Sequence, residues 1–104
     1  MVNCIVAIRT TTSHVDHFLS AISLHWHGLD QKNTFFMDGV PSITQCAIGP
    51  QDYFDYRFKA EPVGTHWYHS HHGAQRSDGM YGAFIVRPRP GSEERLSELS
   101  GEAI

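Results

Sequence analysis

Apolar and polar residues alternate along much of the chain, and this alternation predicts β-strands. The clearest case is residues 53–60 (YFDYRFKA), where aromatic residues at every second position are separated by charged ones, as on a half-buried strand. Shorter runs rich in β-branched and aromatic residues predict further strands at 4–12, 21–27 and 81–87. Glycine- and proline-rich turn signals separate these runs. Several short strands in this arrangement indicate an all-β sandwich or barrel.

Length and composition indicate one domain. The chain has 104 residues, 40% of them hydrophobic and 18% charged, which argues against wholesale disorder. The net charge of -3 and the lack of a basic run argue against nucleic acid as a partner. Apolar stretches are shorter than the roughly 20 residues of a membrane span, and no signal peptide is recognisable at residues 1–10. We expect a domain over 1–90, followed at 91–104 by a polar tail or interdomain linker.

Histidine is the unusual component of this chain. There are eight histidines, and five lie in two groups, His25-Trp26-His27-Gly28 and His69-Ser70-His71-His72. Each group contains His-X-His, and on a strand residues i and i+2 point to the same face. Two such strands side by side would offer four imidazole nitrogens, which suit copper, zinc, iron or nickel. Spacing alone does not choose between copper and a closed, tetrahedral zinc site.

Two longer stretches carry a resemblance to a known family. They are HWHGLDQKNTFFMDGVPSITQCAIGP from His25 and GTHWYHSHHGAQRSDGMYGAFIVRP up to Pro88. Both resemble the multicopper oxidases, which include laccases, ascorbate oxidase and ferroxidases, and the likeness is greatest to laccase-like enzymes of animals and fungi. The resemblance implies a cupredoxin-like Greek-key β-sandwich, specifically the first cupredoxin domain. We expect it to be incomplete at the N-terminus, because early strands usually precede the HWHG motif.

The same resemblance implies particular copper ligands. In the family this domain supplies half the ligands of a trinuclear cluster that reduces dioxygen to water. His25 would bind the type 2 copper, His27 and His69 one type 3 copper, and His71 the other. Asp38 matches an acidic residue near the cluster that is thought to help deliver protons, although Asp before Gly39 is also ordinary turn chemistry.

The chain departs from the family where the type 1 copper is expected. Neither Cys4 nor Cys46 lies beside a histidine, so the His-Cys-His tripeptide of the type 1 site is missing. The two cysteines allow one disulfide at most, and their pairing cannot be assigned from the sequence. We therefore expect the chain alone to be inactive, and expect oxidation of phenols, amines or metal ions to need further cupredoxin domains of the same chain or of a partner chain. The family resemblance also implies an extracellular or secretory-pathway location.

Two alternatives remain open. The chain could be a stand-alone, non-catalytic module that binds copper or zinc, which the missing His-Cys-His favours, or a decayed fragment with neither role. The residues outside the matched ligand set receive structural interpretations: solvent exposure, strand faces, packing or a local turn. They are His14, His17, His66, His72, Trp26, Trp67, Tyr68, Gln75, Arg76 and Asp78.

Overall fold

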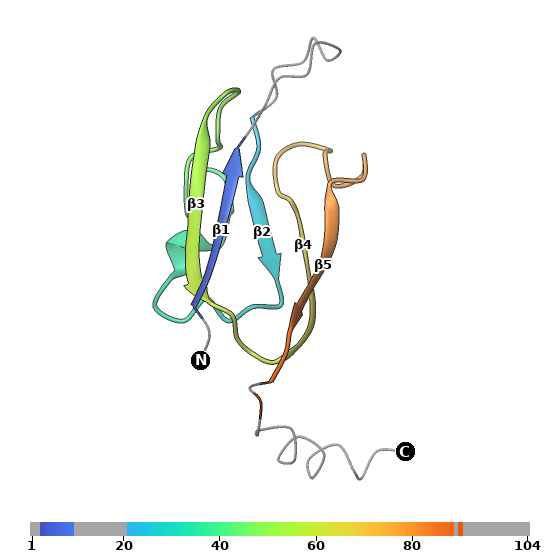
Figure 1. Cartoon of the computed structure of the whole chain (residues 1–104). Coiled ribbons are helices and arrows are strands. Elements are labelled where there is room, and N and C mark those ends of the chain that lie inside the picture. The colour runs from blue at the N-terminus through green and yellow to red at the C-terminus, as the bar shows by residue number, and fades with distance from the viewer. Residues whose placement is uncertain (1–2, 10–20, 89, 91–104) are drawn as a thin grey trace.

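Among the described residues, the computed structural model shows five strands arranged in two antiparallel sheets (Figure 1). The structure describes residues 3–9, 21–88 and 90, and it describes side chains from residue 21 onward. The predicted tail at 91–104, together with His14 and His17, lies outside these residues. The elements in chain order are β1 (Asn3–Arg9), β2 (Leu24–His27), the short 3-10 helix η1 (Phe35–Met37), β3 (Tyr53–Lys59), β4 (Gly64–Ser70) and β5 (Tyr81–Val86).

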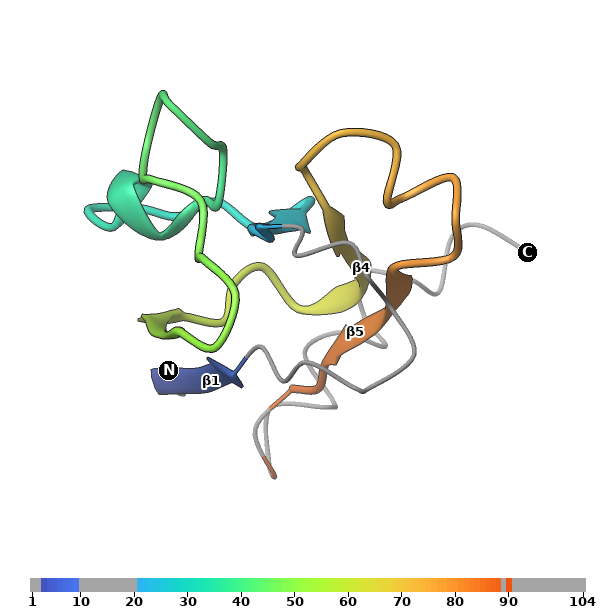
Figure 2. The ribbon, with the colours of Figure 1, turned by 90° about the horizontal axis from the view of Figure 1, so that it is seen from above.

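The first sheet pairs β1 with β3, and the second has the order β2-β4-β5 with β4 in the centre. Figure 2 shows the molecule from above, with the loops that follow β2 and β4 extending beyond the strands. In the second sheet the register sets His25 opposite His69 and His27 opposite Trp67. The sheet therefore brings together two histidine motifs that lie far apart in the sequence.

The strand predictions are largely confirmed. The predicted strands at 53–60 and 81–87 correspond to β3 and β5. The strand predicted at 21–27 is shorter in the structure, where β2 begins at Leu24, because Ile22 makes an isolated bridge to Ile48 instead of joining the ladder. The strand β4 ends at Ser70, one residue before His71. The N–H of His71 nevertheless donates to the carbonyl of Ser23 at 3.0 Å, so the backbone continues beside the β2 segment for one further residue.

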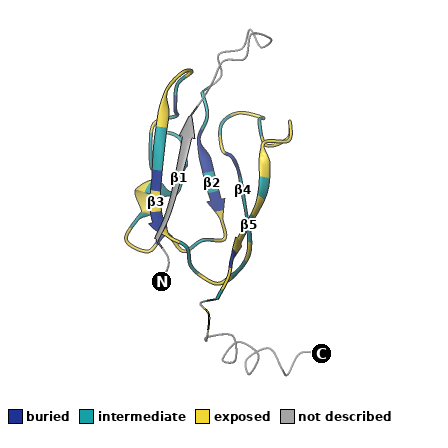
Figure 3. Ribbon diagram, viewed as in Figure 1, coloured by how far each residue is buried: buried dark blue, intermediate teal, exposed yellow. Residues whose placement is uncertain are grey.

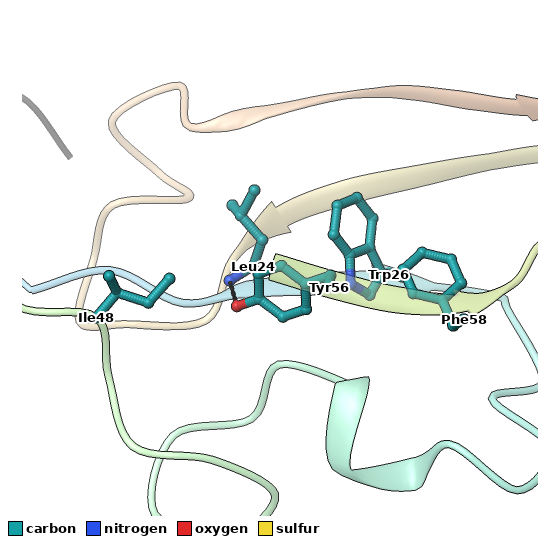
Figure 4. Packing of buried hydrophobic residues seen from close by; sticks show 5 residues of the cluster. All are labelled: Leu24, Trp26, Ile48, Tyr56 and Phe58. Atoms are coloured by element: carbon teal, nitrogen blue, oxygen red, sulfur yellow. Dashed lines mark hydrogen bonds between the residues drawn. The ribbon is translucent and has the colours of Figure 1, made fainter. Parts of the chain in front are cut away.

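The core lies between the sheets and is mostly aromatic (Figure 4). Trp26 is 2% exposed, and its ring centroid lies 5.2 Å from those of Tyr56 and Phe58. Such tilted and edge-on aromatic pairs add stabilisation to the burial of their surface. Leu24 and Trp26 of β2 are buried, while His25 is half-buried and His27 is exposed. Figure 3 shows that most of β2 is buried. Because successive side chains on a strand alternate, the packing of Trp26 directs both histidines to the opposite face.

Tyr56 supplies a buried polar contact that should be measurable as stability. Its hydroxyl accepts a hydrogen bond from the backbone N–H of Leu24 at 3.0 Å (Figure 4). Burial raises the pKa of this phenol above its ordinary value, although its hydrogen bonds oppose the shift. We expect Tyr56→Phe to lower the free energy of unfolding by about 1–3 kcal/mol, because a buried N–H loses its acceptor. Urea denaturation measures this. Tyr53→Phe, at a position 68% exposed, is the matched control, and an equal effect of the two would contradict the assignment.

Two further features of the described residues bear on function. The described helix η1 has three residues, and no described helix has the length and apolar character needed to cross a membrane. Cys46 is an exposed, free thiol. The side chain of Cys4 lies outside the described side chains, so the predicted limit of one disulfide is not tested.

Candidate metal centre

Three histidines converge on the face of the second sheet that points away from the core. His25 and His27 of β2 and His69 of β4 each offer a ring nitrogen, and these three atoms lie within 4.8 Å of one another. The ring centroid of His25 lies 5.4 Å from that of His27 and 5.3 Å from that of His69. The cross-strand pairing of His25 with His69 and the i, i+2 spacing within β2 together produce this cluster.

The spacing of two nitrogens fits a shared metal ion. Nδ1 of His27 lies 3.3 Å from Nε2 of His69. Two imidazole nitrogens bound to one tetrahedral ion at about 2.0–2.1 Å would lie about 3.3–3.4 Å apart. The same two atoms share a hydrogen bond in this structure. The donor set is composed of imidazoles, which suit copper as well as zinc.

Backbone carbonyls fix the protonation of two of these rings. Nδ1 of His69 lies 2.9 Å from the carbonyl oxygen of Ser70, and Nδ1 of His25 lies 2.8 Å from that of Asp38. A carbonyl oxygen can only accept, so both Nδ1 atoms carry the proton and both Nε2 atoms keep a lone pair. Metal-binding histidines commonly donate their second ring nitrogen in this way, which sets the tautomer and the ring orientation. It follows that Nε2 of His69 is the acceptor in its bond with His27.

Asp38 lies beside the cluster. Its carboxylate Oδ1 is 3.2 Å from Nδ1 of His25, close to the carbonyl contact made by the same residue. Both side chains are mostly but not fully buried. Asp38 therefore orients the His25 ring directly, through its carbonyl and its carboxylate.

Trp67, which the sequence predicts to be a packing residue, contacts two rings of the site. Its ring stacks on His27, with centroids 4.9 Å apart and planes inclined by 26°, and lies 4.3 Å from the ring of His69. Trp67 sits opposite His27 in the ladder, which explains the stack. The indole restricts rotation of both rings that share the 3.3 Å contact.

His71 lies at the border of the cluster. Its ring centroid is 5.7 Å from that of His25 and 5.9 Å from that of His69, and the side chain is exposed. The structure thus brings ring nitrogens of three of the four predicted ligands within 4.8 Å of one another and places the fourth residue next to them. His66, interpreted as a strand-face residue, lies in β4, half-buried, and its Nε2 donates to the carbonyl of Pro62 at 2.8 Å.

The pKa of His69 is lowered below 6.5, chiefly by burial of its ring. The hydrogen bond to the Ser70 carbonyl opposes this shift. Positive charge on His25, Arg76 and His27 adds to it. Lowering the pKa favours the neutral ring. The neutral ring is the form that binds a metal, so the fold keeps this nitrogen available at neutral pH.

Gly39 allows Asp38 to approach His25. Gly39 is buried with φ +78°, and a Cβ there would overlap the carbonyl oxygen of Leu24. We expect Gly39→Ala to lower the free energy of unfolding by more than about 2 kcal/mol, because it adds a backbone clash to an unfavourable dihedral angle. Gly49→Ala is the control, since a Cβ at Gly49 meets no atom within 4 Å. Urea denaturation compares the two variants, and equal losses would show that Gly39 is not needed there.

A family model described as multicopper oxidase matches residues 8–91, the segment that carries the whole cluster. The chain belongs to the multicopper oxidase family. Laccase 1 of Metarhizium robertsii is 48% identical over 79 residues, and L-ascorbate oxidase of Cucumis sativus is 49% identical over 73 residues. These matches cover 76% and 70% of this chain but only 13% and 12% of the relatives, so this multicopper oxidase sequence spans a small part of their length.

Solved structures of multicopper oxidases agree with the fold. The laccase from Botrytis aclada superposes with a TM-score of 0.74 at 37% identity, covering 83% of this chain and 15% of that one. This confirms the predicted cupredoxin-like, all-β architecture.

Proposed function

We propose that residues 1–90 are the first cupredoxin domain of a laccase-like multicopper oxidase and supply half the ligands of its trinuclear copper cluster. The observation that carries this proposal is the 3.3 Å approach of His27 Nδ1 to His69 Nε2, with His25 completing a set of nitrogens within 4.8 Å. The backbone carbonyls behind His25 and His69 leave Nε2 of each of these two rings with the lone pair that metal binding needs.

Each histidine has a proposed place in the cluster. His27 and His69 share one type 3 copper, which their separation supports. From the family resemblance, His25 would bind the type 2 copper and His71 the second type 3 copper; their rings lie 5.3 Å and 5.9 Å from that of His69. The remaining ligands come from further cupredoxin domains of the same chain or of a partner chain, and an extracellular or secretory-pathway location stays a prediction.

Copper bound at this site would supply the one-electron steps that reduce dioxygen to water while phenols, amines or metal ions are oxidised. Reducing one dioxygen to two waters consumes four electrons and four protons. The carboxylate of Asp38, 3.2 Å from Nδ1 of His25, can hold a proton at the edge of the site and release it inward. The carbonyls of Ser70 and Asp38 keep the ring orientations fixed while protons move.

A second candidate function is a stand-alone module that binds copper or zinc without catalysis. It is favoured by one observation: His25, His27 and His69 already form a three-nitrogen set within a single chain. Three protein ligands with an open fourth position suffice for a mononuclear ion.

A domain exchange distinguishes the two functions. The segment of Metarhizium robertsii Laccase 1 that aligns with this chain is replaced by the corresponding residues of this chain. Under the oxidase proposal, the chimera purifies with the copper content of its parent and consumes dioxygen with a phenol. Introducing His69→Ala should remove cluster copper and dioxygen consumption while the intense blue absorption of the type 1 site persists. A chimera that keeps the blue absorption but lacks cluster copper would overturn the oxidase proposal and favour the stand-alone module.

A further inference from the structure

Gln75 connects the two segments that carry the metal-binding histidines. Its Nε2 donates to the carbonyl of Ala21, 54 residues away in the sequence, at 3.0 Å. Its Oε1 accepts from the hydroxyl of Ser70 at 2.6 Å. Ala21 precedes β2, and Ser70 ends β4, so one carboxamide group ties the beginning of the His25 strand to the end of the His69 strand.

Ser70 extends this connection to the residues on either side of His71. Ser70 is 3% exposed, and its hydroxyl oxygen also accepts from the N–H of His72 at 3.2 Å. The hydroxyl therefore acts as donor to Gln75 and as acceptor from His72, which matches the capacity of a serine side chain. Buried hydroxyl groups are costly when unpaired, so both bonds hold the turn in place.

The backbone of His71 is consequently fixed from three directions. Its own N–H donates to the carbonyl of Ser23 at 3.0 Å, Ser70 precedes it, and the N–H of His72 is held by the Ser70 hydroxyl. The His71 side chain itself is exposed. Its position relative to His25 depends on this backbone anchoring, because β4 has ended and no ladder continues through it.

We propose that Ser70 and Gln75 are positioning residues that hold His71 at the edge of the histidine cluster. The inference rests on the proposed function, in which His71 is a copper ligand. A glutamine suits this role because one end of its carboxamide accepts from Ser70 and the other donates to Ala21. Glutamate at the same position keeps the acceptor, loses the donor and sets a negative charge against a carbonyl oxygen.

The first test uses the metal-free chain and needs no activity. In wild-type protein, nuclear Overhauser contacts should connect the rings of His25 and His71, whose centroids are 5.7 Å apart. We expect Gln75→Ala and Gln75→Glu to abolish or weaken that contact, while the contacts between His27 and His69 remain. Ser77→Ala, an exposed change in the same loop, is the matched control and should leave every contact intact.

The second test measures copper affinity with a competing chelator. We expect Gln75→Ala to weaken the His71-dependent binding by about 10–100-fold, the usual effect of removing a group that orients a ligand. His71→Ala shows which part of the binding depends on His71. If His71→Ala binds copper as wild type does, the copper role of His71 is wrong, and the ring-contact experiment still decides the positioning role.

The positioning role is overturned if Gln75→Ala keeps both the His25–His71 contact and the affinity of the Ser77→Ala control. If a Gln75 variant fails to fold, hydrogen exchange in the wild-type protein still tests the Gln75 bridge. The side-chain amide protons of Gln75 should exchange with solvent much more slowly than those of the exposed Gln51. Equal exchange rates for the two amides would show that the Gln75 bridge is absent.

Discussion

The His27→Ala/His69→Ala double variant should bind copper at least about 100-fold more weakly than the wild-type chain. Metal binding at a four-ligand structural zinc site is worth about 10–16 kcal/mol, or on the order of 3 kcal/mol for each ligand, so the loss of two ligands exceeds the roughly 2.8 kcal/mol of a 100-fold change. These two residues hold the nitrogens that lie 3.3 Å apart, and their loss removes one ion's pair of ligands. Titration of copper against a competing chelator gives the affinities.

The matched control removes the same number of imidazoles, one from β4 and one from the loop that follows it. In His66→Ala/His72→Ala the histidines lost are outside the set of nitrogens that lie within 4.8 Å. The hydrogen bond from the N–H of His72 to Ser70 is a backbone contact and survives the substitution. If this control loses as much copper as the first variant, the assignment of His27 and His69 is wrong.

Copper affinity should also fall by at least about 100-fold between pH 7 and pH 5. An imidazole must be neutral to bind a metal, and an unperturbed histidine, with a pKa of about 6.5, gains most of its proton in this range. His69 has a lowered pKa, so its share of the loss occurs at lower pH than that of an ordinary histidine. Protons compete with copper for the imidazoles as the pH falls, so copper affinity decreases at low pH and recovers as the pH rises.

A site built on carboxylates would behave differently over the same interval. An ordinary aspartate has a pKa of about 3.9 and remains ionised at pH 5, so a site centred on Asp38 would hold its metal until nearer pH 4. Chelator competition at several pH values, corrected for titration of the chelator, separates the two cases. Affinity that is flat from pH 7 to pH 5 is incompatible with a histidine site.

The fold was predictable where the two faces of a strand differ in polarity. In β3 the buried Tyr56 and Phe58 alternate with charged, exposed residues, and the pattern identified the strand within one residue. The strand β4 has no such contrast, since aromatic and histidine side chains occupy both faces and several are half-buried. Its strand character could be inferred from the His-X-His motif but not from its hydrophobic pattern.

The site was predictable to the level of residues but not of atoms. Spacing placed His25 and His27 on one face, and the resemblance paired them with His69. The choice of Nδ1 in His27 and Nε2 in His69 depends on ring rotation, which Trp67 and the Ser70 carbonyl determine. The sequence predicts only a local turn around Gln75, and the hydrogen bond from Gln75 to Ala21 could not be predicted, because nothing in the sequence shows that residues 54 positions apart meet.

The alternation of side chains along β2 couples correct folding to formation of the histidine cluster. When Leu24 and Trp26 point into the core, His25 and His27 must point away from it, because successive side chains on a strand alternate. A shift of one residue in the pairing of β2 would exchange the two faces, burying imidazoles and exposing the indole. Such a misaligned chain would lose its aromatic core and its metal ligands together, so metal uptake reports strand register as well as ligand identity.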